Sequence, residues 1–224
     1  MKYVASFADR VLPWLTCVLM IIALAFVFLY VPNERIQGPA QRIFYFHLPA
    51  AWNTFLGFFI VAGASAAFLW QGDRFSDLLA QASAEVGMVF CTLVIITGSI
   101  WARPIWGVWW TWDPRLTMVA ILWMIYAAYI LLRLLAGDNE LIARYAAVLG
   151  IVGVLDIPLL YIAVKLWRGI HPKVERMAPE MMWTLLVCAA AFLCLFGWLI
   201  WLRLRSLTLR DEVAALRRHV LAVS

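Results

Sequence analysis

The chain has 224 residues, of which 66% are hydrophobic and only 14% are charged, and its formal net charge is +5 at pH 7. In soluble domains about a quarter of the residues are charged. The apolar residues gather in six long blocks, and a water-soluble core has no room for so many all-round hydrophobic helices in so short a chain. The four cysteines lie within these blocks and form neither a CxxC nor a CxxCH motif. The composition therefore excludes an ordinary soluble protein, argues against thiol redox chemistry and predicts an all-α integral membrane protein.

Six membrane spans follow from the length of the apolar blocks, because a bilayer core about 30 Å thick needs about twenty apolar residues per helix. The predicted spans cover residues 11–31, 50–70, 78–101, 116–132, 145–164 and 181–202. Asp113 followed by Pro114 is typical of an N-cap with proline in the first turn, and Pro49 and Pro179 are expected to open the second and sixth spans. The first block lacks a small-residue cleavage site and is expected to be retained. Residues 1–224 then form a single six-span domain with a cytoplasmic tail at 203–224.

The basic residues give a weak orientation signal. With both termini in the cytoplasm, the cytoplasmic segments hold ten of the 18 Lys and Arg residues, five of them in the tail. The remaining eight lie in outer loops, where they either bind something anionic or, like Lys165 and Arg168, reach from a helix end to the interface. In the tail, Thr208 and Asp211 either cap a short amphipathic helix or belong to a solvated basic segment.

A tryptophan-rich segment, WARPIWGVWWTWDPR, is expected to form the outer loop between the third and fourth spans. Four tryptophans between residues 106 and 112 exceed what anchoring one loop requires, and such a segment lying flat on the membrane would present a large planar apolar surface. Arg103 and Arg115 flank the run and could pair with carboxylates at the edge of a flat ligand. A haem with its propionates fits this description. A quinone, a lipid, a partner's hydrophobic helix or a simple aromatic belt remain alternatives.

Two of the three histidines lie on the same side as the tryptophans. His47 is expected at the end of the first outer loop and His171 in the third, each closely followed by a proline that should hold it outside a helix. Neutral imidazole is the commonest axial ligand of haem iron, so the two histidines could occupy the two faces of one haem. Ligands on loops can move apart, which favours handover over permanent storage. The alternative is an interfacial histidine satisfied by water.

Two acidic residues and a set of small residues are placed within the spans. Glu85 is expected to reach cytoplasmic water, and Asp156 to take part in polar pairing at a kink caused by Pro158. Small residues at one face of a span allow close helix packing. This packing is expected for the fifth span at Ala146, Gly150 and Gly153, and for the second span at Ala62 and Ala66.

The segment WGVWWTWDPR resembles the tryptophan-rich WWD signature of the haem-handling protein family. The six-span layout, with His47 before the motif and His171 after it, is similar to that of the haem exporter C family of bacterial cytochrome c maturation. The likeness covers nearly the whole chain. In KLWRGIHP the single tryptophan, Trp167, stands where the family is expected to have a pair, which leaves its role open.

The resemblance implies a function in the bacterial inner membrane. Haem b would bind non-covalently at the periplasmic face as transported cargo, with His47 and His171 as axial ligands of the iron. The supporting residues would be Trp106, Trp109, Trp110, Trp112 and Asp113, with Arg103 and Arg115 at the edges. The implied partners are a membrane-anchored periplasmic haem chaperone, a small single-span accessory subunit, the membrane and ATPase subunits of an ABC transporter, and membrane lipid. No nucleic-acid partner and no enzymatic activity are expected.

Two other functions compete with haem delivery. A transporter that carries haem across the bilayer would need a polar or ligating route from the cytoplasm, and Glu85 and Asp156 are too few to define one. A membrane cytochrome that exchanges electrons with quinone would need pairs of histidines facing each other from within helices. The sequence places no histidine within a predicted span, so delivery without covalent chemistry is favoured.

Overall fold

The computed structural model describes residues 2–135, 139–166 and 177–223, and this part of the chain is almost entirely helical. Six of its helical stretches are long and apolar enough to cross a membrane, which confirms the predicted all-α membrane fold. The α-helices are α1 (Lys2–Ala25), α2 (Phe44–Gln71), α3 (Arg74–Trp106), α4 (Pro114–Leu135), α5 (Glu140–Val154), α6 (Asp156–Leu166) and α7 (Pro179–Val223). A π-helical turn extends α1 over Phe26–Tyr30, and a 3₁₀ turn over Pro39–Ile43 leads into α2.

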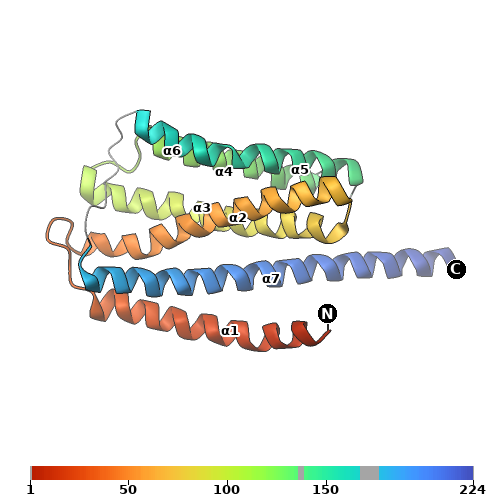
Figure 1. Cartoon of the computed structure of the whole chain (residues 1–224), viewed down its shortest axis with the longest axis horizontal. Coiled ribbons are helices and arrows are strands. Elements are labelled where there is room, and N and C mark those ends of the chain that lie inside the picture. Colours follow the sequence, from red (N-terminus) through yellow and green to blue (C-terminus); the bar gives the residue numbers. More distant parts are fainter. Residues whose placement is uncertain (1, 136–138, 167–176, 224) are drawn as a thin grey trace.

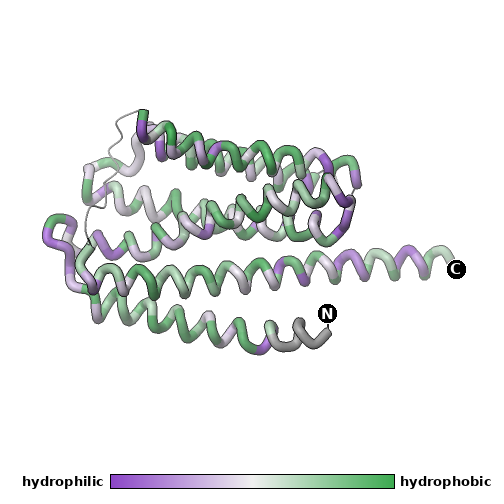
Figure 2. Tube along the Cα trace, in the orientation of Figure 1, coloured by the Kyte–Doolittle hydropathy of each residue, from purple (hydrophilic) through white to green (hydrophobic). Residues whose placement is uncertain are grey.

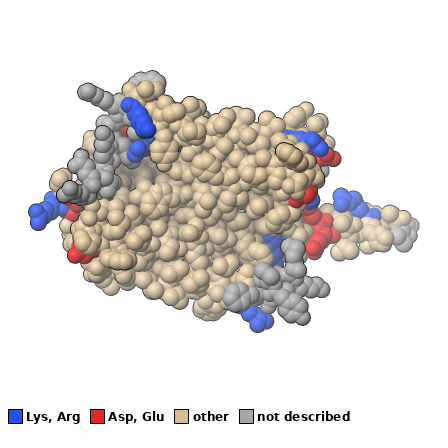
Figure 3. Space-filling model, in the orientation of Figure 1, with Lys and Arg blue, Asp and Glu red and all other residues tan. Residues whose placement is uncertain are grey.

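The helices run side by side along one axis (Figure 1). Both termini lie at one end of the bundle, and the segments 31–43 and 107–113 lie at the other, which we call the loop end. Hydrophobic residues cover the length of the bundle while hydrophilic residues concentrate toward its ends (Figure 2). On the face drawn in Figure 3, charged side chains likewise lie toward the two ends, and the middle is covered by uncharged residues. This distribution is what a bilayer-spanning bundle requires.

Several helix boundaries differ from the sequence-based prediction. The second span was expected to open at Pro49, but α2 already begins at Phe44 and contains this proline. One proline near the start of a helix removes a single backbone hydrogen bond, which membrane helices tolerate. The third span was expected to end at residue 101, but α3 continues to Trp106 and ends at Gly107, whose φ of 76° is left-handed. The start of α4 at Pro114 and of α7 at Pro179 agree with the prediction.

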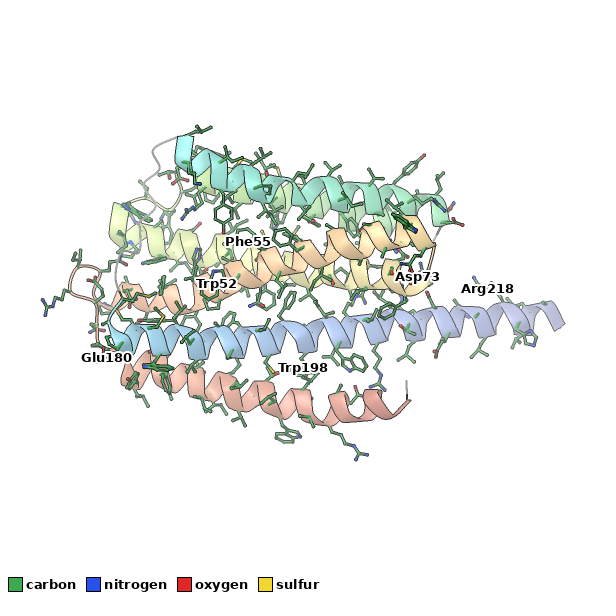
Figure 4. The ribbon with its side chains drawn as sticks, in the orientation of Figure 1. Trp52, Phe55, Asp73, Glu180, Trp198 and Arg218 are labelled. Carbon is green, nitrogen blue, oxygen red and sulfur yellow. The ribbon has the colours of Figure 1, made fainter. Side chains whose placement is uncertain are left out.

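The expected break after residue 202 is absent from α7, which continues without interruption to Val223 and projects beyond the other helices (Figure 1). No glycine or proline lies between residues 203 and 223 to end the helix. The predicted caps have other partners: the Thr208 hydroxyl donates to the Leu204 carbonyl, and the Asp211 carboxylate accepts from Arg74 at 2.7 Å and 2.9 Å. Arg218 lies on the projecting part of the helix (Figure 4).

Stacked aromatic rings and small residues hold the centre of the bundle together. The rings of Phe58 on α2 and Tyr126 on α4 stack at 3.6 Å and 7°. A Cβ added at Gly150 would lie 2.8 Å from Val61, and one added at Gly153 would lie 2.9 Å from Ile125, so both glycines are needed for close packing, as predicted. The corresponding prediction for the second span is wrong. Ala62 is half-buried and Ala66 is exposed, whereas the buried face of α2 carries Val61, Ala64 and Ser65.

Ion pairs connect neighbouring helices at the end of the bundle where the termini lie. The buried Asp77 carboxylate accepts from Arg133 and from Arg74, both at 2.5 Å. Glu85, which was expected simply to reach water, pairs with Arg203 of α7 at 2.5 Å. These contacts give the charged residues partners within the bundle and fix α3 against α4 and α7, so they serve structure.

A break at Leu155 separates α5 from α6, three residues before Pro158, the proline that was expected to cause a kink. The Asp156 side chain lies at this break and is only 5% exposed. Its Oδ2 has no hydrogen-bond partner among the described residues. The predicted polar pairing of Asp156 is therefore not found with any described side chain.

Candidate functional site

A cavity of about 220 Å³ opens at the loop end between α2, α3, α4 and α6, beneath the tryptophan-rich loop. Its walls are mostly apolar, with aromatic residues on several sides. Of the residues proposed from the sequence, it brings together six: His47, Trp106, Trp109, Trp110, Asp113 and Arg115. Residues that come from four separate segments of the chain therefore converge on one hollow, which is the geometry of a ligand site.

His47 differs from its predicted setting, because it lies in the first turn of α2 and not in a loop. Its Nδ1 lies 3.0 Å from the Thr97 hydroxyl of α3, and its ring meets the Trp101 ring edge-on at 5.9 Å. Both contacts come from α3, so the imidazole is held between two packed helices. The argument that a loop ligand moves away easily therefore does not apply to His47. The expectation that Pro49 keeps His47 out of a helix is also wrong, since this proline lies within α2.

The tryptophan-rich loop is shorter than expected and is not a flat segment. It covers only residues 107–113, because Arg103, Pro104 and Trp106 belong to the last turns of α3. Gly107 turns the chain away from the helix in a left-handed conformation that other residues rarely adopt. The rings of Trp110 and Trp112 meet at 80°, so together they form an edge-to-face pair and not one planar surface.

Two of the proposed site residues lie away from the cavity. The Trp112 side chain is 80% exposed and does not line the cavity. Arg103 donates to the Gly107 carbonyl, and its guanidinium lies 6.0 Å from the centre of the Trp109 ring. This arrangement makes Arg103 a brace for the loop, so the predicted pairing of Arg103 with a ligand carboxylate is not supported by its position. Arg115, in the first turn of α4, does line the cavity.

Asp113 has a structural role that the sequence also predicted. Its Oδ1 accepts from the Leu116 amide at 2.9 Å, and its carbonyl accepts from the Thr117 amide, so it is the N-cap of α4. The tryptophan loop is therefore tied to the start of α4 through this carboxylate. The second oxygen, Oδ2, is buried and has no partner among the described residues, so the cap leaves one acceptor unused.

Buried polar atoms without partners gather around the cavity. Within the described part of the chain, Trp110 Nε1, Thr111 Oγ1 and Arg115 Nε are buried without a hydrogen bond, as is Asp113 Oδ2. Leaving such atoms unpaired in a folded protein is costly, and most buried polar groups are satisfied. Two donors, one on Trp110 and one on Arg115, beside an apolar hollow suit a ligand with an apolar body and hydrogen-bond acceptors at its edge.

Several cavity residues were missed by sequence reasoning. Trp52 and Phe55, labelled on α2 in Figure 4, line the cavity. Tyr161 of α6 also lines the cavity, with its ring 6.4 Å from that of Phe55. Trp101 is tied to the segment before α2, because its Nε1 donates to Gln37 at 3.1 Å. The spacing of Trp52 and Phe55 one helical turn apart is the signal that could have placed them on one face.

His171, the second proposed iron ligand, lies outside the described residues, as do Trp167 and Arg168. The third histidine, His219, lies on the projecting part of α7, far along the helix from the loop end. In the described part of the chain, no group of three or more His, Cys, Asp and Glu side chains is arranged to hold a metal ion. The cavity, with one imidazole among aromatic side chains, therefore differs from a site in which several protein side chains hold a bare metal ion.

Comparison with known proteins gives a consistent result. The family model described as heme exporter protein C matches residues 1–219. Heme exporter protein C of Bradyrhizobium diazoefficiens is 35% identical over 218 residues, covering 93% of this chain and 82% of the relative. The protein of the same name from Escherichia coli K12 is 32% identical, covering 90% and 85%. A putative cytochrome c biosynthesis ccmC-like mitochondrial protein of Marchantia polymorpha is 33% identical, covering 62% and 59%.

Proposed function

Because the chain belongs to the heme exporter protein C family, we propose that it binds haem b as cargo at the loop end and passes it to a membrane-anchored periplasmic haem chaperone during cytochrome c maturation. The protein is a multi-pass component of the bacterial inner membrane. In this proposal the loop end faces the periplasm and both termini face the cytoplasm. The protein performs no covalent chemistry on the haem.

The observation that carries the proposal is the convergence of an imidazole, several indole rings and unpaired donors on one cavity. Each part suits a different part of haem. The His47 imidazole provides an axial ligand for the iron. The apolar walls accept the porphyrin, and the donors Trp110 Nε1 and Arg115 Nε hydrogen-bond to its carboxylates. His171 is proposed as the ligand on the other face of the iron.

The size of the cavity supports transfer over storage. At about 220 Å³ it is smaller than the 300–1,000 Å³ usual for ligand pockets. The haem therefore lies partly outside the cavity, against Trp109, whose side chain is 58% exposed. In this proposal Trp112, which is 80% exposed and meets the Trp110 ring edge-on, contacts the haem edge or the incoming chaperone. A cargo that is partly covered can be taken by a partner without unfolding the site.

The remaining partners are proposed from the family. They are a small single-span accessory subunit and the membrane and ATPase subunits of an ABC transporter, with lipid around the apolar faces. A route that carries haem through this chain is not proposed. At the end where the termini lie, Asp77 pairs with Arg133 and Glu85 pairs with Arg203. Phe58 and Tyr126 stack across the centre of the bundle.

Equilibrium titration of the purified haem-free protein with haem, followed by the Soret absorption, tests the cavity. Replacing both Trp109 and Trp110 by alanine should weaken binding at least tenfold, because stacking area and a donor are lost. Trp70 is the matched control: it is 91% exposed at the far end of α2, and Trp70→Ala should bind as the parent does. Equal affinity for the parent and the double variant would contradict the proposal.

A further inference from the structure

We propose that Thr97 is a positioning residue for iron ligation by His47: its hydroxyl holds the imidazole with the proton on Nδ1, and Gly98 leaves the ring room to lie against α3. This inference rests on the proposed function only for the identity of the ligand. The position of the proton can be tested in the protein without haem.

The direction of the hydrogen bond follows from the second contact of the Thr97 hydroxyl. Its Oγ1 lies 2.6 Å from the Leu93 carbonyl oxygen and 3.0 Å from His47 Nδ1. A carbonyl oxygen only accepts, and a hydroxyl has one proton to donate. At 2.6 Å that proton must point to Leu93, because two oxygens without a proton between them would repel each other. The hydroxyl therefore accepts from His47, so Nδ1 carries the proton.

The consequence concerns the other ring nitrogen. In a neutral imidazole one nitrogen carries the proton and the other carries the lone pair. With the proton on Nδ1, the lone pair is on Nε2, and Nε2 is the nitrogen that ligates iron. Metal-ligating histidines usually donate their second N–H in this way, which fixes the ring and makes it a stronger ligand.

The neighbouring residue sets the distance between the ring and the helix. A Cβ added at Gly98 would lie 3.1 Å from His47 Cε1 and 3.6 Å from Nδ1, closer than an ordinary van der Waals contact allows at Cε1. Cε1 lies between the two nitrogens, so pressure on it tilts the ring and redirects both. Thr97, Gly98 and the edge-on Trp101 thus restrain the imidazole through a hydrogen bond, a steric limit and a ring contact.

The first test is ¹⁵N NMR of the histidines in the haem-free protein at about pH 8.5, where imidazole is neutral. His47→Ala identifies the His47 signals. The parent and Thr97→Ser should show a protonated Nδ1 and an unprotonated Nε2 for His47. Thr97→Val, which keeps the shape but lacks the hydroxyl, should show exchange between the two tautomers. A parent with the proton on Nε2, or a Thr97→Val spectrum equal to that of the parent, would overturn the inference.

The second test measures haem binding and the ferric EPR spectrum. Thr97→Val should weaken haem binding by about 10- to 100-fold and alter the EPR g-values, as loss of a supporting partner typically does. Gly98→Ala should change both in the same direction, because its methyl group would press on the His47 ring. Thr97→Ser should restore the parent behaviour. Two controls match the substitutions. Thr184→Val removes a buried hydroxyl that bonds its own helix, and Gly63→Ala adds a Cβ in open space.

The outcomes separate this inference from the proposed function. If His47→Ala loses haem while Thr97→Val and Gly98→Ala bind it with the parent's affinity and g-values, His47 remains the ligand and the positioning role is refuted. If His47→Ala binds haem as the parent does, the ligand assignment itself fails. Size-exclusion chromatography in detergent shows whether each variant is folded before its binding is compared.

Discussion

Substitutions of Asp113, the N-cap of α4, distinguish the contribution of this residue to the stability of the protein from its contribution to haem binding. Asp113 Oδ1 accepts from the Leu116 amide at 2.9 Å, so Asp113→Ala removes one capping bond and should lower the free energy of unfolding by about 1 kcal/mol. Asparagine caps as well as aspartate, so Asp113→Asn should remain near the parent. Because the loop ends at this cap, Asp113→Ala should also weaken haem binding, by at most about fivefold, the equivalent of 1 kcal/mol.

The assay is unfolding by SDS in mixed micelles, followed by circular dichroism, beside the haem titration of each variant. Asn139→Ala is the matched control. It removes the same kind of cap from α5, where the Leu141 amide donates to Asn139 at 2.9 Å, at the end of the bundle away from the cavity. It should lose stability and keep haem affinity. Equal destabilisation by Asp113→Asn and Asp113→Ala would refute the capping argument, because asparagine can cap the helix and alanine cannot.

Three further results are expected. Arg133→Met should destabilise the protein by about 3 kcal/mol in the same SDS assay, since it takes the 2.5 Å partner from the buried Asp77 carboxylate; an unchanged midpoint would show that this pair does not hold α3 to α4. The pKa of Glu34 is lowered because the backbone amides of Gln37 and Ile36 donate to its carboxylate. The protection of these two amides from hydrogen exchange should therefore persist when the pH falls below the ordinary pKa of 4.5, and it should disappear at still lower pH. In Glu34→Gln this protection should not vary with pH. A cysteine at Val108 should react with an impermeant maleimide in intact cells and one at Arg218 only after permeabilisation; the reverse would invert the proposed orientation.

The number of membrane spans and their helical nature could be predicted from sequence, because hydropathy over twenty residues is a strong signal. The ends of the helices were harder. Pro49 was expected to open a helix and lies within one, and α3 extends past residue 101 through Pro104. Proline restricts helices less in a membrane than in water, since neighbouring groups and a non-aqueous surrounding favour continued helix. Asp113 was a better guide, because its side chain satisfies a backbone amide at the start of α4.

The rotation of each helix could be predicted only in part. Gly150 and Gly153 lie on the packed face of α5 as expected, but Ala62 and Ala66 do not lie on that of α2. In a helix that is apolar all round, lipid and protein accept the same side chains, so hydrophobicity does not mark the buried face. The packing of neighbouring side chains decides it, as at Gly150, where an added Cβ would lie 2.8 Å from the Val61 side chain.

The candidate site was predicted by residue type and not by shape. Three of the four tryptophans between residues 106 and 112 line one cavity with His47 and Arg115, yet the expected flat surface is a folded loop over a hollow between helices. Trp52 could not be assigned to the cavity, because a tryptophan that anchors a helix at the membrane interface and one that lines a cavity look the same in a sequence. The Thr97 contact joins residues 50 positions apart and has no local sequence signal.

The central claim is that His47 ligates haem iron at the loop end, and the visible absorption spectrum of the purified protein tests it most directly. The parent, His47→Ala, His171→Ala and the control His219→Ala should be purified in detergent from the same haem-replete cells, with haem quantified by pyridine extraction. The account predicts a Soret band in the parent and in His219→Ala, and a lost or shifted band in the other two variants. A folded His47→Ala protein with the haem content and spectrum of the parent would contradict it.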